Sequence, residues 1–304
     1  MSLRVSAVQV PFSYTSAPQE FFDRVFPLIE RAARDGAQIV ALPDYTGLML
    51  LGVAVPVEQE ALLLGEIAGA RGFPTVAAML LEVAPTMGEF YMHLFASIAA
   101  RLGIFLAPGT VIERSDERLF NTAYLFAPDG TVFGSQKQTH RAAREIAWGL
   151  SQSDELRVFD IDIARIGFVV GTDIEYPEVA RILALQNANL LIHPAAYPVW
   201  NEQYFLLDLW REVQANQVFG LQACAIGVDF KGKSAVYAPV EMTEPHRGWL
   251  AQAERADAKA VVTATLDFDA LQDVVDGYPI FDFFNYGFYA REFPGAYRSR
   301  LVWR

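Results

Sequence analysis

Four positions in this 304-residue chain combine residue types and spacings that could carry chemistry. Asp44 ends the apolar run "IVALPD", and Lys137 and Glu145 lie eight residues apart after the segment "TVFGS". The fourth position is Gly171 in "GFVVGTDIEYPE", where an apolar run stops at a tight turn and Pro177 suits the start of a helix. α/β enzymes often place a nucleophile at such a turn. Glycine, however, offers no attacking atom.

Each of these residues also has an ordinary structural interpretation. Asp44 could close a turn, and Lys137 and Glu145 could be solvated surface charges. Gly171 could simply join a strand to a helix. All four, however, follow candidate strands, and α/β folds bind their ligands at the carboxyl ends of strands. The four positions together therefore predict a ligand site.

The elements that must position these residues alternate between strand and helix. "LRVSAVQV" is β-branched and alternating, which predicts a strand, and "AQIVALPD" is a continuous apolar run typical of a strand buried on both faces. Helices are predicted over residues 18–35 and 88–102. Residues 118–137 predict a hairpin, because Ala-Pro-Asp-Gly at 127–130 has the chemistry of a tight turn. This order predicts an α/β fold whose sheets are not purely parallel.

The order and spacing of these segments resemble the nitrilase superfamily, the carbon–nitrogen hydrolases that include nitrilases, amidases and carbamoylases. The segments that carry the resemblance are, in chain order, "VSAVQV", "GAQIVALPD", "NTAYLFAPDGTVFGSQKQTH", "EIAWGLSQSDELRVFD", "IGFVVGTDIEYPEVARILALQNANLLIHPAA", "LWREVQANQVFGLQACAIG" and "GKSAVYAPVE". Their collinear order, rather than any single segment, makes the resemblance specific. It implies a four-layer α-β-β-α sandwich in one domain over residues 1–304, in a family that typically forms dimers.

The resemblance also implies a Glu-Lys-Cys triad, in which a thiolate attacks a nitrile or amide carbon and forms a covalent acyl-type intermediate. Lys137 matches the charge-stabilising lysine, and Glu145 matches a second glutamate that helps to position substrate. Asp44 stands where the base glutamate is expected, so the carboxylate is kept but its reach is one methylene shorter. Gly171 stands where the cysteine is expected, and Asp173 matches a position that is normally acidic.

No other residue is expected to replace the missing thiol. Cys224 lies in the apolar run "GLQACAIG" and is predicted to be buried in the core. Thr172 is next to the gap, but no histidine is nearby in the sequence to activate its hydroxyl, so it is assigned to the pocket with Asp173. His193 is predicted to be a strand-end residue, and Glu175 would disfavour anionic substrates at the mouth of the pocket.

The composition of the chain indicates which kinds of partner, cofactor and cellular environment to expect. The net charge of −12 argues against a nucleic-acid partner, because phosphate binding needs clustered Lys and Arg. No Cys/His cluster has metal-ligand spacing, so neither a metal nor another cofactor is expected. The uncharged run 45–57 is too short to span a bilayer, and no secretory signal is evident. A single cysteine excludes an intrachain disulfide and fits a cytoplasmic protein.

Three functions stay open from the sequence. The first is a carbon–nitrogen hydrolase for a small amide, carbamoyl or nitrile compound, impaired or inactive because the triad is incomplete. The second is a pseudoenzyme that binds a small amide-like ligand or regulates a partner. The third is an oligomeric interaction protein, a homodimer or larger, in which the aromatic tail of about 277–304 packs on the body or on a second subunit.

Overall fold

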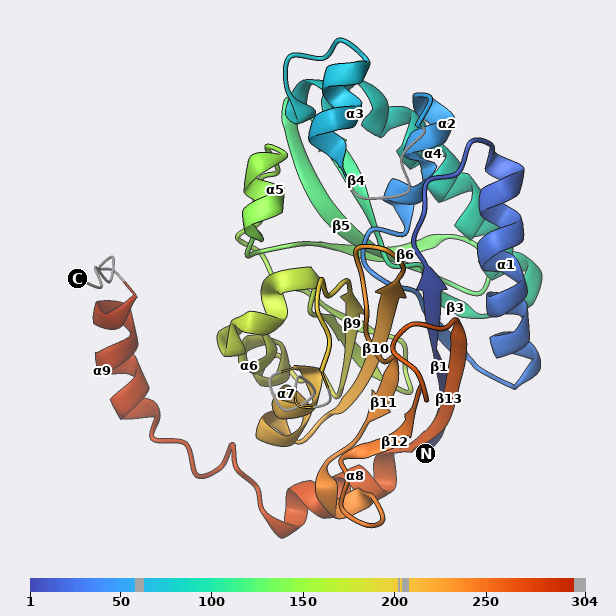
Figure 1. Ribbon diagram of the computed structural model, residues 1–304. Coiled ribbons are helices and arrows are strands. Elements are labelled where there is room, and N and C mark those ends of the chain that lie inside the picture. The colour runs from blue at the N-terminus through green and yellow to red at the C-terminus, as the bar shows by residue number, and fades with distance from the viewer. Residues whose placement is uncertain (58–62, 202, 204–207, 298–304) are drawn as a thin grey trace.

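The computed structural model describes residues 1–57, 63–201, 203 and 208–297. Two β-sheets pack face to face, and helices cover the outer face of each sheet. Figure 1 shows α1 (Pro18–Arg34) on one side of the strands and α6 (Pro177–Leu185) and α7 (Leu209–Asn216) on the opposite side. The four-layer α-β-β-α sandwich expected from the sequence is thereby confirmed.

The first sheet carries Asp44 at the end of one of its inner strands. Its strands, in spatial order, are β4 (Thr110–Ser115), β5 (Arg118–Phe126), β3 (Phe105–Ala107), β2 (Ile39–Ala41) and β1 (Ser2–Pro11), with β6 (Val132–Lys137) paired to β5 and β13 (Ala260–Asp267) paired to β1. β5 and β6 pair antiparallel, which confirms the predicted hairpin. β1 and β2 pair parallel, as buried apolar strands of α/β folds commonly do.

The second sheet carries Gly171 after one of its strands. Its members are β7 (Val158–Asp160), β8 (Arg165–Phe168), β9 (Leu190–Ala195), β10 (Phe219–Ile226), β11 (Ala235–Tyr237) and β12 (Trp249–Gln252). β8, β9 and β10 run parallel to one another. A short parallel pairing, Val10 with Ala225 and Pro11 with Ile226, joins this sheet to the first.

Alternation along β1 decides which core each side chain enters. Leu3, Val5 and Ala7 lie in the core between the two sheets. Val8 and Val10 lie in the core between the first sheet and its helices. Because successive side chains of a strand point to opposite faces, one strand contributes to both layers. This arrangement fixes the two sheets back to back and brings their carboxyl ends to a common edge.

Helices flank both sheets, and the last of them lies away from the body. They are α1 (Pro18–Arg34), α2 (Leu51–Ala54), α3 (Leu64–Ala70), α4 (Val76–Leu102), α5 (Ala143–Ala147), α6 (Pro177–Leu185), α7 (Leu209–Asn216), α8 (Phe268–Gly277) and α9 (Tyr286–Ala296). The structure begins α4 well before the predicted residue 88, because Thr75 caps its first turn and Pro85 is accommodated inside the helix. Within the described residues, no helix has the length and apolar character needed to cross a membrane.

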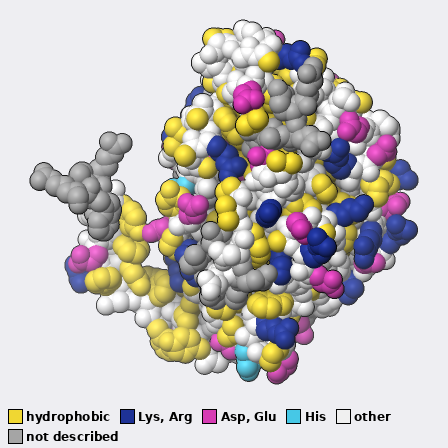
Figure 2. Space-filling model, viewed as in Figure 1, with side chains coloured by type: hydrophobic (Ala, Val, Ile, Leu, Met, Phe, Trp, Pro, Cys, Tyr) yellow, Lys and Arg dark blue, Asp and Glu magenta, His cyan; other side chains and the backbone are white. Residues whose placement is uncertain are grey.

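The segment from α8 to α9 leaves the body of the protein, as Figures 1 and 2 show. Its links to the body include Gln217 Nε2, which donates to the Tyr278 carbonyl at 2.9 Å, and Arg181, whose guanidinium lies 5.1 Å from the rings of Phe281 and Phe284. Many of its aromatic side chains are exposed, namely Tyr278, Phe283, Tyr286, Phe288, Phe293 and Tyr297. Tyr297 OH nevertheless donates a hydrogen bond to Glu178 of α6, and Trp303, also part of the predicted tail, lies outside the described residues.

Candidate functional site

Asp44 is held rigidly just beyond β2, and only 3% of its surface is exposed. Its Oδ1 accepts hydrogen bonds from Thr110 Oγ1 at 2.7 Å, Asn121 Nδ2 at 3.0 Å and Tyr45 N at 3.1 Å. Among the described residues, none donates a hydrogen bond to Oδ2, which faces Gly171. Burial raises the pKa of Asp44, although the hydrogen bonds from Asn121 and Thr110 oppose the rise.

Gly171 opens a 3-10 turn, Gly171–Glu175, between β8 and α6. Its φ of +51° lies in the left-handed region that favours glycine. A Cβ at this position would lie 3.0 Å from Asp44 Oδ2 and 3.2 Å from Gln138 Nε2. A side chain here would therefore point at Asp44, which is the geometry expected of the nucleophile position, but glycine leaves that space unfilled.

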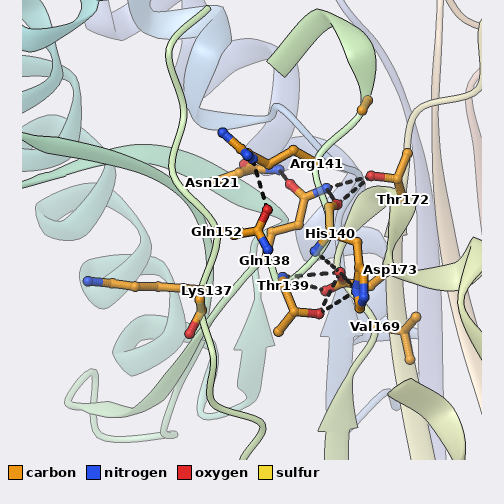
Figure 3. Close-up of polar contacts among 12 residues, drawn as sticks. Asn121, Lys137, Gln138, Thr139, His140, Arg141, Gln152, Val169, Thr172 and Asp173 are labelled. Atoms are coloured by element: carbon orange, nitrogen blue, oxygen red, sulfur yellow. Dashed lines mark hydrogen bonds and ion pairs between the residues drawn. The ribbon is translucent and has the colours of Figure 1, made fainter. Parts of the chain in front are cut away.

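The structure does not bring Lys137 to this site. Lys137 Nζ lies 3.6 Å from Glu113 Oε1 and 4.3 Å from the centre of the Phe120 ring, in a separate surface hollow of about 400 Å³. Figure 3 shows its side chain pointing away from that of Gln138. The expected placement is corrected by one residue, because neighbours at the end of β6 point to opposite faces.

Gln138 occupies the position beside Asp44 and Gly171 instead. Its Nε2 lies 3.0 Å from Glu145 Oε2, 2.8 Å from Thr172 Oγ1 and 2.7 Å from the His140 carbonyl. Its Oε1 accepts from Asn121 Nδ2 at 3.0 Å. Gln138 thus connects both carboxylates of the site through a buried polar network, but it contributes no positive charge.

Glu145 lies at the start of α5, near enough to Asp44 for the charge of Asp44 to act on it. Its Oε1 accepts from Tyr45 OH at 2.6 Å, and its Oε2 accepts from Ala142 N at 2.6 Å. Burial, reinforced by the charge of Asp44, raises the pKa of Glu145 to about 7. All of these contacts fix Glu145 in place, so it supports the site rather than reaching freely into it.

Thr172 and Asp173 join the Gly171 turn to the loop after β6. Asp173 is fully buried and accepts hydrogen bonds from Thr139 N at 3.1 Å, Thr139 Oγ1 at 2.8 Å and His140 N at 2.6 Å. Thr172 Oγ1 donates to the His140 carbonyl at 2.7 Å (Figure 3). The Thr172 hydroxyl is therefore committed to the loop, and both residues act as structural supports.

A cavity of about 240 Å³ opens beside Gly171. Its charged and aromatic lining residues are Asp44, Tyr45, Arg144, Glu175, His193 and Tyr197. Arg144 packs its guanidinium 5.9 Å from the Tyr45 ring and 5.6 Å from the Phe230 ring. The sequence analysis did not single out Arg144. Arg144 is the second residue of α5, and its side chain lines the cavity because α5 lies beside Asp44.

His193 and Cys224 occupy different positions relative to the cavity. His193 lies inside β9, two residues before the strand ends at Ala195 and not at its end as predicted, with Nδ1 2.7 Å from the Val169 carbonyl and Nε2 2.9 Å from Tyr197 OH. Cys224 is buried in β10, as predicted, and is not among the residues that line the cavity. Burial raises the pKa of its thiol well above the ordinary value, so it stays protonated.

The described residues contain no group of three or more His, Cys, Asp or Glu side chains that could hold a metal ion. The site instead consists of two buried carboxylates, a buried amide and a cationic rim. Gln138 and Asn121 were missed because each has a neutral side chain that carries no catalytic signature by itself. The one available signal was strand alternation, since Gln136 and Gln138 share one face and are both buried.

Comparisons with known proteins extend over nearly the whole chain. Omega-amidase NIT2 of Xenopus tropicalis is 26% identical over 287 residues, covering 91% of this chain and 93% of the relative. The human omega-amidase NIT2 is 26% identical over 290 residues, covering 92% and 94%.

Solved structures show the same fold. A carbon–nitrogen hydrolase from Helicobacter pylori superposes with a TM-score of 0.74 at 18% identity, covering 95% of this chain and 97% of that one. A cysteine-to-alanine mutant of the amidase from Nesterenkonia, in complex with butyramide, gives a TM-score of 0.67 at 20% identity, covering 89% and 93%. The carbon–nitrogen hydrolase family model matches residues 4–274. This protein therefore belongs to the carbon–nitrogen hydrolase family.

Proposed function

We propose that this protein is a non-hydrolytic member of its family that binds a small molecule non-covalently in the cavity beside Gly171. The observation that carries the proposal is the geometry of Gly171. The position that points at Asp44 Oδ2 has no side chain, and the nearest hydroxyl, that of Thr172, is hydrogen-bonded to the His140 carbonyl.

The covalent mechanism of the family requires more than a sulfur. It needs a nucleophile, a base and a cation that stabilises the developing negative charge. In this chain those places hold Gly171, Asp44 and Gln138, and Lys137 lies in another hollow. Losing a single donor for a developing oxyanion costs about a hundred- to a thousandfold in rate, and no pKa shift replaces an absent nucleophile. Two of these deficits together favour binding over turnover.

The cavity keeps the properties of a binding site. Its volume of about 240 Å³ is below the ~300–1,000 Å³ usual for sites of drug-sized ligands, which favours a compact molecule. Asp44 is pre-oriented through Oδ1, so Oδ2 can accept a hydrogen bond without reorganisation. A further support comes from the Nesterenkonia amidase, whose cysteine-to-alanine mutant was solved with butyramide. An amide can therefore occupy this fold when the sulfur is absent.

Two measurements on the full chain test the proposal. Ammonia release from a broad panel of amides, carbamoyl compounds and nitriles should not exceed the rate in buffer. A thermal-shift screen of small metabolites should give at least one stabilising ligand. That shift should shrink in Gly171→Ala, where the added Cβ enters the space beside Asp44, and persist in Lys137→Ala, whose side chain lies in the separate hollow. Turnover that scales with protein concentration would refute the proposal.

We also propose that the chain assembles into a homodimer or a larger homo-oligomer through the segment from α8 to α9. The observation that favours this is the row of exposed aromatic rings on a segment that leaves the body. Exposed apolar area of this kind usually marks an interaction surface. Ending the chain after residue 276 should lower the mass measured by light scattering while the body stays folded. An unchanged mass would refute this assignment.

A further inference from the structure

The cavity beside Gly171 carries two opposite charges that lack ion-pair partners. Asp44 Oδ2 faces Gly171, and the three hydrogen bonds to this carboxylate all go to Oδ1. Arg144 lines the same cavity, and its positive charge opposes the rise in the pKa of Asp44, but no carboxylate of the described residues lies within ion-pair distance of its guanidinium. Groups of this kind are costly to leave without partners in a partly enclosed site. Both therefore point to groups on a ligand.

The space beside Asp44 suits a protonated nitrogen. A charge-assisted N–H···O hydrogen bond has a nitrogen–oxygen distance of about 2.7–2.9 Å. A Cβ at residue 171 would lie 3.0 Å from Asp44 Oδ2. A ligand nitrogen placed in the space that glycine leaves open would therefore be at about hydrogen-bond distance from Asp44 Oδ2. Gln138 Nε2 borders the same volume, but three acceptors, on Glu145, Thr172 and His140, already compete for its two hydrogens.

Arg144 suits an anionic group at the other end of the ligand. Its guanidinium is stacked near the rings of Tyr45 and Phe230, at 5.9 Å and 5.6 Å, which orients its planar set of donors. Such a fork matches a carboxylate better than a lysine ammonium does. Glu175, exposed at the rim, disfavours ligands whose charge is purely negative.

We infer that this cavity binds a small amino-acid-type zwitterion, with its ammonium group on Asp44 Oδ2 and its carboxylate on Arg144. The inference rests on the proposed function, because it assumes non-covalent binding in this cavity. The inference goes beyond the proposed function because the ligand is a zwitterion, with one positive and one negative group, and not the neutral amide expected of the family. The volume of about 240 Å³ restricts this ligand to a short carbon chain.

Calorimetric titration of the full chain with matched probes tests the inference. The probes are the ω-amino acids from glycine to 5-aminovalerate and, for each, the primary amine, the carboxylic acid and the primary amide with the same number of carbons. One zwitterion should bind at least about tenfold more tightly than its amine, acid and amide counterparts, which corresponds to about 1.4 kcal/mol.

Two variants assign the two ends of the ligand. Asp44→Asn keeps the acceptor for Thr110 and Asn121 and places an N–H₂ donor at the cavity, so it should weaken the zwitterion and the amine at least about tenfold but not the acid. Arg144→Gln, at the partly exposed rim, should weaken the zwitterion and the acid but not the amine. Lys137→Ala is the control and should change none of these affinities. Circular dichroism verifies that each variant is folded.

The outcomes separate the inference from the proposed function. Preference for an amide that persists in Asp44→Asn would overturn the zwitterion and leave non-covalent binding intact. Equal affinities for the zwitterion and the amine, unchanged in Arg144→Gln, would also overturn it. If no probe binds, the inference fails. The proposed function fails as well only if the thermal-shift screen of metabolites also finds no stabilising ligand. Hydrolysis of an amide refutes the proposed function on separate grounds.

Discussion

Replacing Gly171 by alanine tests the geometry on which the site depends. At φ +51° a residue with a Cβ costs about 1–2 kcal/mol relative to an ordinary conformation. The added Cβ would also lie 3.0 Å from Asp44 Oδ2 and 3.2 Å from Gln138 Nε2, so both side chains must shift by a few tenths of an ångström. Weakening one hydrogen bond to a buried carboxylate adds about 1 kcal/mol. We expect Gly171→Ala to lower the free energy of unfolding by about 2–3 kcal/mol.

Urea unfolding followed by tryptophan fluorescence measures this change against two matched controls. Gly103 has a φ of +63° but no atom within 4 Å of its added Cβ, so Gly103→Ala isolates the backbone cost of about 1–2 kcal/mol. Gly65 lies in α3 and also has nothing within 4 Å, so Gly65→Ala should stabilise the protein by about 0.5–1 kcal/mol.

The order of the three variants decides the matter. If Gly171→Ala is as stable as Gly65→Ala, residue 171 does not adopt the left-handed conformation and the reasoning about the site collapses. If Gly171→Ala loses as much free energy of unfolding as Gly103→Ala, residue 171 does adopt the left-handed conformation, but the contact between the added Cβ and Asp44 costs nothing. Only a larger loss than that of Gly103→Ala supports a Cβ position that touches the carboxylate.

The remaining predictions concern the network around the cavity. Gln138→Leu should lower the free energy of unfolding by about 2–4 kcal/mol, because it leaves buried partners without hydrogen bonds. Lys137→Leu should change the free energy of unfolding by no more than about 1 kcal/mol. The reverse order in urea unfolding would contradict the placement of these two residues. Asp173→Asn should cost about 2–3 kcal/mol in the same assay, since it weakens the bonds from Thr139 and His140, and a neutral result would deny that role. Burial raises the pKa of Glu145 to about 7 from 4.5, so the native state holds a proton that the unfolded state has lost, and the free energy of unfolding should fall as the pH rises from about 5 to about 7. Glu145→Gln should flatten that fall by up to ~1.4 kcal/mol per pH unit, and identical pH profiles would argue against the raised pKa. Gly171→Cys alone should not release ammonia from amides, whereas Gly171→Cys combined with Gln138→Lys restores both missing groups and should give measurable turnover; equal activity of the single and double variants would show that no cation is needed.

Local residue patterns predict individual strands and turns, and the family resemblance implies the layers that they form. The β-branched, alternating run "LRVSAVQV" predicts a strand, and β1 forms there, although only the structure shows that its two faces enter different cores. The hairpin turn at 127–130 was also readable, because Pro and Gly specify its backbone locally. These features depend on the spacing of apolar residues and on local backbone preferences, both of which can be read from the sequence.

The tertiary structure decided which polar side chains meet. Lys137 and Gln138 are neighbours in the chain, and a one-residue step along β6 sends one to a surface hollow and the other to Asp44. Arg144 has no recognisable signature in the sequence, and only the placement of α5 brings it to the cavity. The physical reason is that side-chain direction is set by strand register and helix placement, which arise from packing across the whole molecule. Gly171 was readable as a missing nucleophile, but only the fold showed that the missing volume lies against an unpartnered carboxylate oxygen.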